Sequence, residues 1–147
     1  MNVDPQYLAA AKEQAGICAI DYKLVAAVCE QESSWLPFSI RYEPGFLAKY
    51  VAPIYNACKI SATEAYARSF SWGLMQIMGQ TARELGFTGE SLAELCDPET
   101  GIEFGCRKLA ACLKNAGGDQ TKALPAYNGG SNPNYAAEVL ARVKNYQ

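Results

Sequence analysis

The chain has 147 residues, of which 50% are apolar and 19% are charged, a composition typical of a globular domain rather than a disordered segment. With 13 basic and 15 acidic side chains, the net charge of −2 makes nucleic acid a poor partner. The sequence contains no histidine, which excludes Ser-His-Asp and Cys-His nucleophile systems and His-ligated zinc. We therefore predict one domain over residues 1–147, in which any catalysis must depend on carboxylates, tyrosine, lysine, cysteine or backbone dipoles.

Apolar residues recur at helical spacing in several stretches of the chain. They predict helices over about residues 5–15, 22–33, 81–85, 98–115 and 133–145. Three of these helices begin with an N-cap residue directly before a proline suited to the first turn, at Asp4-Pro5, Asp97-Pro98 and Asn132-Pro133. Residues 37–61 predict a long irregular insertion with a short helix near residues 46–51. No stretch shows sustained alternation of polar and apolar residues bounded by turn residues, so we expect a mainly α fold of about six to eight helices.

The cysteines give little guidance on pairing, because none forms a C-x-x-C pair and six allow fifteen full pairings. They are Cys18, Cys29, Cys58, Cys96, Cys106 and Cys112. We interpret most as reduced core residues, with one or two disulfides left open for a protein that works outside the cytoplasm. Residues 1–14 lack the features of a secretory signal, and no apolar run approaches about 18 residues. We expect synthesis in the cytoplasm without a signal peptide, and no stable membrane insertion.

Glu32 lies on the apolar face of the predicted helix over residues 22–33. That face consists of Leu24, Val25, Val28 and Cys29, and the i, i+3, i+4 spacing brings Glu32 next. A carboxyl group there would be partly desolvated, which raises its pKa and keeps it protonated near neutral pH. Glycosidic cleavage needs such an acid, because the departing sugar oxygen takes up a proton. Periodicity alone favours the plainer interpretation of a boundary glutamate that reaches solvent or pairs with Lys or Arg.

Several short motifs follow Glu32 in a fixed order. They are E-S at residues 32–33, G-L-M-Q at 73–76, T-A at 81–82, L-G at 85–86 and A-Y-N at 126–128. Residues 97–105 are similar to a D-P-x-x-N-I-x-x-G stretch, with Gly101 in place of the usual asparagine. Over about residues 24–140 the sequence resembles the soluble-type lytic transglycosylases, whose fold is lysozyme-like. Glu32 and Gly73 are 41 residues apart, more than is usual in the family, and this version resembles the small enzymes of phages and prophages.

The resemblance implies that Glu32 is the single catalytic acid and base. As the acid it would protonate the oxygen between N-acetylmuramic acid and N-acetylglucosamine, and as the base it would deprotonate the muramic acid C6 hydroxyl, which closes a 1,6-anhydro ring. The partners implied are peptidoglycan glycan strands, met in the periplasm or from a virion by a monomeric, endolysin-like enzyme. We expect no cofactor and no metal, because the sequence has no cysteine ligand pattern and no phosphate loop.

Further residues match the family's substrate-binding positions. They are Ser33, Gly73, Met75, Gln76, Tyr127 and Asn128. Gln76 and Met75 would line the saccharide groove, Ser33 would orient the substrate or the acid, and Gly73 fits a turn or a close backbone approach. The Tyr127 hydroxyl would meet the catalytic carboxyl, and Asn128 would bring its amide to the site. Core packing of Met75 and a capped turn at Asn128 are the structural alternatives.

A second carboxylate near Glu32 would permit hydrolysis by a positioned water instead. Glu43 is one candidate, although a salt bridge to the neighbouring Arg41 or a place in the groove wall explains it as well. Glu64 is a weaker one, because it starts a helix after a cap at Ser61 or Thr63. The alternative functions are therefore a lysozyme-like muramidase and, from another class, a non-catalytic wall-binding or virion structural module.

Overall fold

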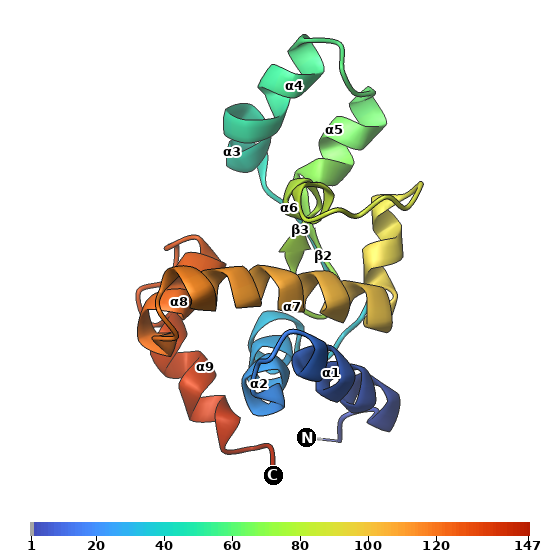
Figure 1. The fold of residues 1–147 in the computed structure, drawn as a ribbon. Helices are drawn as coiled ribbons and strands as arrows, with labels where there is room; N and C mark the ends of the chain where they lie inside the picture. Colours follow the sequence, from blue (N-terminus) through green and yellow to red (C-terminus); the bar gives the residue numbers. More distant parts are fainter. Residues whose placement is uncertain (1) are drawn as a thin grey trace.

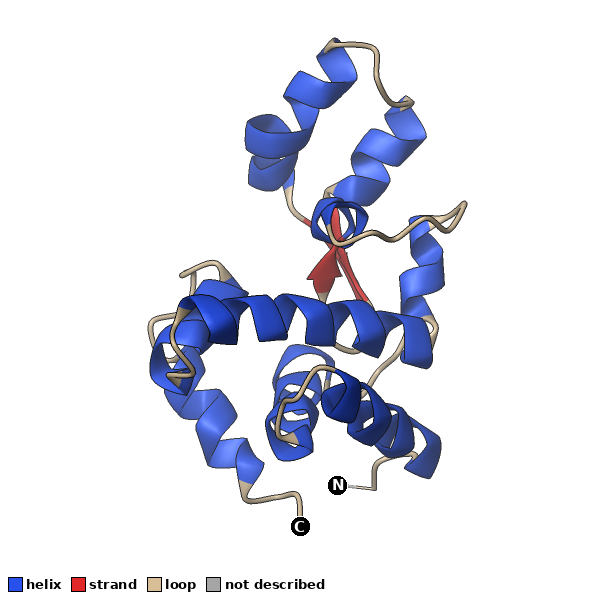
Figure 2. Ribbon diagram, viewed as in Figure 1, coloured by secondary structure: helices blue, strands red, loops and turns tan. Residues whose placement is uncertain are grey.

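The computed structural model describes residues 2–147 as a mainly helical fold with one small sheet, which confirms the predicted fold class (Figure 1, Figure 2). The elements are, in order, α1 (Pro5–Ile17), α2 (Tyr22–Ser33), β1 (Ile40–Tyr42), α3 (Pro44–Phe46), a π-helical segment (Leu47–Val51), α4 (Ala52–Asn56), α5 (Ala62–Arg68), β2 (Phe70–Trp72), β3 (Ile77–Met78), α6 (Gly79–Glu84), a 3-10 segment (Leu92–Cys96), α7 (Pro98–Asn115), α8 (Gln120–Asn128) and α9 (Tyr135–Val143). None of these helices is long and apolar enough to cross a membrane.

The predicted caps explain where the long helices begin. Asp4 accepts a hydrogen bond from the Gln6 amide at 2.8 Å, and Asp97 accepts one from the Thr100 amide at 3.0 Å. Both helices carry proline in the first turn, where an N–H has no partner within the helix. α9 begins two residues later than Pro133, because the Asn132 side chain caps a turn at Asn134 instead.

The insertion is more regular than expected. Residues 44–56 wind almost continuously through α3, the π-helical segment and α4. Pro44 and Pro53 do not break this winding, because each stands in the first turn of a helix. The flanking residues form the antiparallel sheet β1-β2-β3, in which Ile40 pairs with Trp72 and Ser71 pairs with Met78. The sheet joins the insertion to the G-L-M-Q segment.

Two apolar clusters fill the interior, and α7 contributes to both. The larger cluster packs α1, α2, α8 and α9 around α7 residues Ile102 and Leu109. The smaller one lies between the sheet and the 3-10 segment, and includes Ile77, Leu95 and Phe104. Figure 1 shows α7 running between α1 and α2 on one side and the sheet on the other. This helix therefore fixes the position of the sheet relative to α2.

The cysteines are free thiols in three environments. Cys29, Cys96 and Cys106 are buried, Cys18 and Cys112 are half-buried, and Cys58 is exposed. Burial raises the pKa of Cys106 to about 12, so this thiol packs in the core as a neutral group. The interpretation as reduced core residues fits the buried thiols and does not fit Cys58.

Gly73 begins the turn between β2 and β3, at the place where the backbone approaches the 3-10 segment. Its φ is +72°, and a Cβ atom there would lie 2.3 Å from the carbonyl oxygen of Leu95. Gly101 faces the same oxygen, and a Cβ atom on it would lie 2.4 Å away. The crowding around Leu95 thus explains both glycines, including the one that replaces the usual asparagine.

We expect Gly73→Ala to lower the free energy of unfolding by about 3 kcal/mol, because it adds a backbone clash to the cost of a left-handed residue. Gly118→Ala is the matched control, since Gly118 has a φ of +84° and no neighbour within 4 Å of a Cβ position. That control should lose only about 1 kcal/mol, the conformational part. Urea unfolding of both variants measures the difference, and equal losses would show that Leu95 does not crowd Gly73.

Candidate active site

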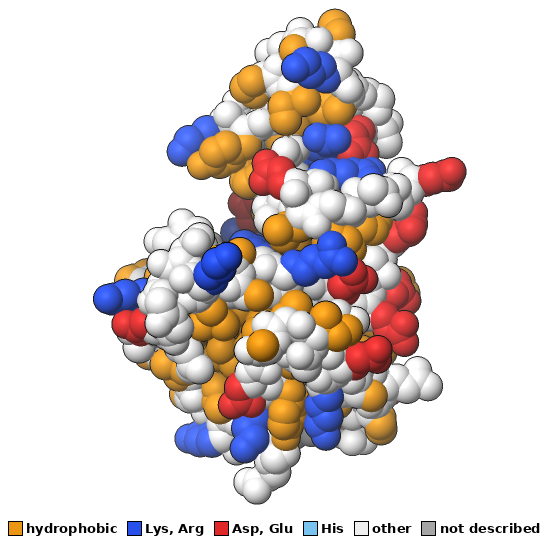
Figure 3. Space-filling view, in the orientation of Figure 1, with side chains coloured by type: hydrophobic (Ala, Val, Ile, Leu, Met, Phe, Trp, Pro, Cys, Tyr) orange, Lys and Arg blue, Asp and Glu red, His pale blue; other side chains and the backbone are white. Residues whose placement is uncertain are grey.

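A cleft of about 410 Å³ lies where the insertion, the sheet and α8 face the end of α2. Glu32 comes from α2, Glu43 and Phe46 from the insertion, Gln76 from the G-L-M-Q segment and Lys108 from α7. The A-Y-N segment at residues 126–128 completes the opposite wall. Figure 3 shows the surface hollowed between the part built from α3–α6 and the part that contains α8. The structure thus brings most of the sequence motifs to one cavity.

Glu32 lies in the last turn of α2, which ends at Ser33 and is capped by Ser34 in a left-handed conformation. The hydroxyl of Tyr135 donates a hydrogen bond to Glu32 Oε1 at 2.5 Å. Burial raises the pKa of Glu32 above its usual range, and this outweighs the lowering by the Tyr135 hydrogen bond and by the charges of Lys108 and Arg41. Glu32 therefore holds its proton to a higher pH than an exposed glutamate does, as an apolar helix face favours.

Tyr135, rather than Tyr127, supplies the hydroxyl that meets Glu32. The Tyr127 hydroxyl donates instead to the backbone oxygen of Met75 at 2.7 Å. The expected contact between Tyr127 and Glu32 is therefore wrong, because α8 directs this ring into the core toward the G-L-M-Q segment. Tyr135 shares the apolar face of α9 with Val139. A tyrosine hydroxyl buried on an apolar helix face needs a hydrogen-bond partner. This pattern in the sequence of α9 could have indicated that Tyr135 contacts a polar group such as Glu32.

Met75 and Ser33 do not line the cleft. Met75 is fully buried against Gly105, where a Cβ atom would lie 2.4 Å from the methionine sulfur. Ser33 is buried as well, and its hydroxyl lies 3.0 Å from the Cys29 oxygen and 2.8 Å from the Leu74 oxygen. The structure therefore does not place these two side chains where the predicted substrate contacts would be, and both instead join the G-L-M-Q segment to α2 and α7.

Gln76 and Asn128 line the cleft, but both amides hold the backbone. Gln76 Nε2 donates to the Ser39 oxygen at 2.8 Å, and its Oε1 accepts from Ser71 Oγ at 2.8 Å. Asn128 Oδ1 accepts from the Asn132 amide at 2.9 Å, the capped turn expected as the alternative. Each amide therefore gives the cleft its shape, and Gln76 has both ends of its amide occupied by protein groups.

Comparison with known proteins shows which family shares the motifs around Glu32. The sequence matches the family described as Transglycosylase SLT domain over residues 9–146. The chain belongs to this family. No solved structure matches it. The matched range includes every residue that lines the cleft, and the family supports a peptidoglycan-cleaving activity of the lytic transglycosylase or lysozyme type.

Lys108 is a residue of the SLT domain's cleft that no motif in the sequence marks. Its Nζ donates to the Tyr127 backbone oxygen at 2.7 Å and lies 4.4 Å from the centre of the Tyr127 ring. Burial lowers the pKa of Lys108 below its usual value, and the charges of Cys112 and Glu32 offset this only in part. Sequence reasoning missed it because an exposed and a cleft-facing lysine look the same in a helical pattern.

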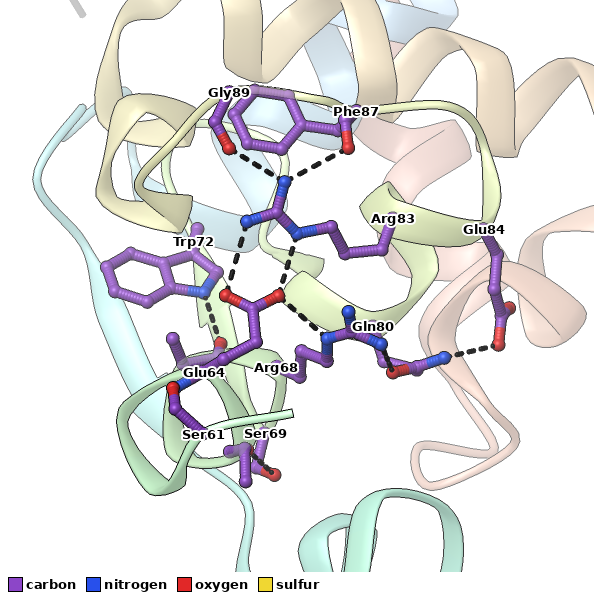
Figure 4. Close-up of polar contacts among 12 residues, drawn as sticks. Ser61, Glu64, Arg68, Ser69, Trp72, Gln80, Arg83, Glu84, Phe87 and Gly89 are labelled. Carbon is purple, nitrogen blue, oxygen red and sulfur yellow. Dashed lines mark hydrogen bonds and ion pairs between the residues drawn. The ribbon is translucent and has the colours of Figure 1, made fainter. Parts of the chain in front are cut away.

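The two candidate second carboxylates differ in position. Glu43 lines the cleft and forms an ion pair with Arg41 at 2.8 Å. Glu64 does not line it; its carboxylate pairs with Arg68 at 2.7 Å and with Arg83 at 2.8 Å. Figure 4 shows Arg83 also reaching the backbone oxygens at Phe87 and Gly89. In the SLT domain Glu64 therefore joins α5 to α6 and the loop that follows. Among residues 2–147 no cluster of side chains has the makeup of a metal site.

The Glu64 network predicts a pH-dependent contribution to stability. Burial alone would raise the pKa of Glu64, but the hydrogen bonds from Arg83 and Arg68 outweigh it and lower the pKa. Its stabilisation is therefore complete above the unfolded pKa of about 4.3 and is lost as the pH falls through the lower folded value. We expect Glu64→Gln to cost about 2 kcal/mol at pH 7 and much less at pH 3.

Chemical denaturation at both pH values measures this loss. Glu43→Gln is the control, because its ion pair with Arg41 is largely exposed and contributes about 0.5 kcal/mol at most. A loss from Glu64→Gln that is the same at pH 3 and pH 7 would contradict the ionic contribution.

Proposed function

We propose that this SLT domain is a lytic transglycosylase that cleaves the β-1,4 bond between N-acetylmuramic acid and N-acetylglucosamine. The observation that carries the proposal is Glu32, a carboxyl group in the cleft whose pKa burial raises. The protonated acid gives its proton to the glycosidic oxygen as the bond to C1 breaks. The resulting carboxylate takes the proton of the C6 hydroxyl, whose oxygen bonds to C1. The products are a free N-acetylglucosamine end and 1,6-anhydro-N-acetylmuramic acid.

The surroundings of Glu32 suit both halves of this cycle. Burial favours the protonated acid before cleavage, and the Tyr135 hydroxyl stabilises the carboxylate after it. Because the substrate supplies its own nucleophile, one carboxyl group is sufficient. We propose glycan strands of the cell wall as the substrate, met by a monomer in the periplasm or from a virion.

Hydrolysis is the second candidate function, and Glu43 is the observation that favours it. The Glu43 carboxylate lines the same cleft as Glu32 but comes from the insertion rather than from α2, so it is available to activate a water. Glu43 would then act as the base of a muramidase, with Glu32 unchanged as the acid. The products distinguish the two reactions, because hydrolysis adds one water.

We expect Glu32→Gln to lower turnover of purified sacculi by about 10²- to 10⁴-fold, because an amide has the shape of the acid but gives up no proton. Glu13→Gln, at an exposed site on α1, is the matched control and should leave turnover unchanged. Release of soluble muropeptides measures the rate, and circular dichroism shows that both variants fold. Turnover of Glu32→Gln near that of the wild type would mean that Glu32 is not the acid, and inactivity of the folded wild type would favour a non-catalytic wall-binding module.

Mass spectrometry of the muropeptides separates transglycosylation from hydrolysis. We expect products one water lighter than reducing muramic acid, both from the wild type and from Glu43→Gln. That variant leaves Glu32 in place and should lose only the contribution of Glu43 to the cleft wall. Reducing muramic acid from the wild type, together with an inactive but folded Glu43→Gln, would establish the muramidase instead.

A further inference from the structure

Lys108 brings a positive charge into the cleft that the protein itself does not pair. Its side chain is half-buried and lines the cavity with Glu32. Among residues 2–147, no carboxylate lies within ion-pair distance of its Nζ. Arg41, the other cation of the cleft, is already paired with Glu43. A half-buried ammonium without a counter-ion is costly, so its position calls for an explanation beyond folding.

Two contacts hold the Lys108 side chain in place, and both favour its charged form. Nζ donates to the Tyr127 backbone oxygen at 2.7 Å, and the same ammonium lies 4.4 Å from the centre of the Tyr127 ring. A carbonyl oxygen and a ring face both attract a cation, whereas neither neutralises it. Lys108 is therefore fixed to α8 with its charge intact, and an ammonium has three N–H donors, of which this carbonyl takes one.

The proposed reaction changes the charge of Glu32. The acid is neutral when substrate binds and becomes a carboxylate once its proton has moved to the glycosidic oxygen. A lone carboxylate in a partly desolvated cleft is unfavourable, so a cation fixed nearby stabilises the state that follows proton transfer. The two groups come from different helices, Glu32 from α2 and Lys108 from α7.

We propose that Lys108 is a positioning residue that acts as the counter-charge of Glu32: it stabilises the carboxylate left by proton donation and so sets the upper pH limit of activity. This inference rests on the proposed function, in which Glu32 is the acid. Lys108 acts through Glu32 and takes no part in bond breaking.

The other groups that face the pair are few. Glu32 meets the Tyr135 hydroxyl from α9 and the charge of Arg41 from β1, with the Cys29 thiol on its own helix. Lys108 faces the Cys112 thiol on α7, and Glu32 also faces the Tyr127 hydroxyl from α8; burial raises the pKa of both groups. Both stay neutral through the working pH range. The positive charge of Lys108 lowers the pKa of Glu32, the direction that the proposal requires.

The experiment measures the pH dependence of kcat/KM on soluble glycan fragments for Lys108→Gln, Lys108→Met and Lys108→Arg. Glu32 works only while protonated, so activity falls as the pH rises through its pKa. Removing the cation raises that pKa, so the high-pH limb should move up by about one pH unit in the Gln and Met variants. Their maximum kcat should fall about tenfold, because the carboxylate loses its counter-charge. Lys108→Arg keeps the charge and should keep the wild-type limb.

The controls separate charge from structure. Lys114→Met makes the same substitution at an exposed site of the same helix and should leave the profile unchanged. Thermal melting shows which variants fold. If Lys108→Met does not fold, Lys108→Gln decides the test, because its amide keeps an N–H donor for the Tyr127 oxygen. An unmoved limb in the folded neutral variant, or an equal shift in Lys108→Arg, would overturn the inference. The Glu32→Gln variant separates failure of this inference from failure of the proposed function, because activity in Glu32→Gln would overturn the proposed function itself.

Discussion

One carboxyl group, partly buried at the end of α2, is the constraint on which the cleft depends. A buried carboxyl group holds its proton only while its surroundings exclude water, and it can lose that proton in catalysis only if its carboxylate has partners. α9 provides the Tyr135 hydroxyl at 2.5 Å, and α7 provides the charge of Lys108. The elements that carry these groups also form the larger core. The helices that form the larger core therefore also hold the groups that influence the protonation of Glu32.

The motif residues that do not touch the cleft hold its walls together. Ser33 joins the end of α2 to the Leu74 carbonyl, and Tyr127 joins α8 to the Met75 carbonyl. Each bond satisfies a buried backbone oxygen that no strand partner takes, since β3 begins only at Ile77. The G-L-M-Q segment is thus clamped from two sides. The buried side chains of this motif therefore fix the position of the backbone beside the cleft, and this explains why the motif spans buried residues.

Local signals in the sequence determine the long helices, whereas the contacts around Glu32 depend on tertiary packing. Asp4, Asp97 and the apolar periodicity were sufficient to place α1 and α7, because caps act within one turn. α8 was not predicted, because Pro125 interrupts its pattern. The sheet was missed as well, because its strands have at most three residues, which is too short for a sustained alternation of polar and apolar residues. The apolar face of α2 identified Glu32, while Tyr135 and Lys108, which act on it, are more than 70 positions away.

The choice between Tyr127 and Tyr135 shows why motif order alone could not assign the hydroxyl. Both rings are buried on neighbouring helices, and both belong to the same core. Which hydroxyl reaches Glu32 depends on how α8 and α9 turn toward α2, and a capped turn at Asn128 and Asn132 sets that angle. A sequence motif specifies residue types and their spacing, whereas the direction of each side chain depends on how the helices pack.

The insertion gives the cleft a wall whose support lies outside the cleft. Glu43 and Phe46 face the cavity, yet they are carried by a segment that lies beyond the larger core. The sheet anchors this segment at one end, and the Glu64 ion pairs with Arg68 and Arg83 anchor α5 at the other. Because Arg83 also binds the loop after α6, the network fixes three elements at once. The insertion wall is therefore supported in part by ionic contacts outside the cleft, which are separate from the helices that hold Glu32.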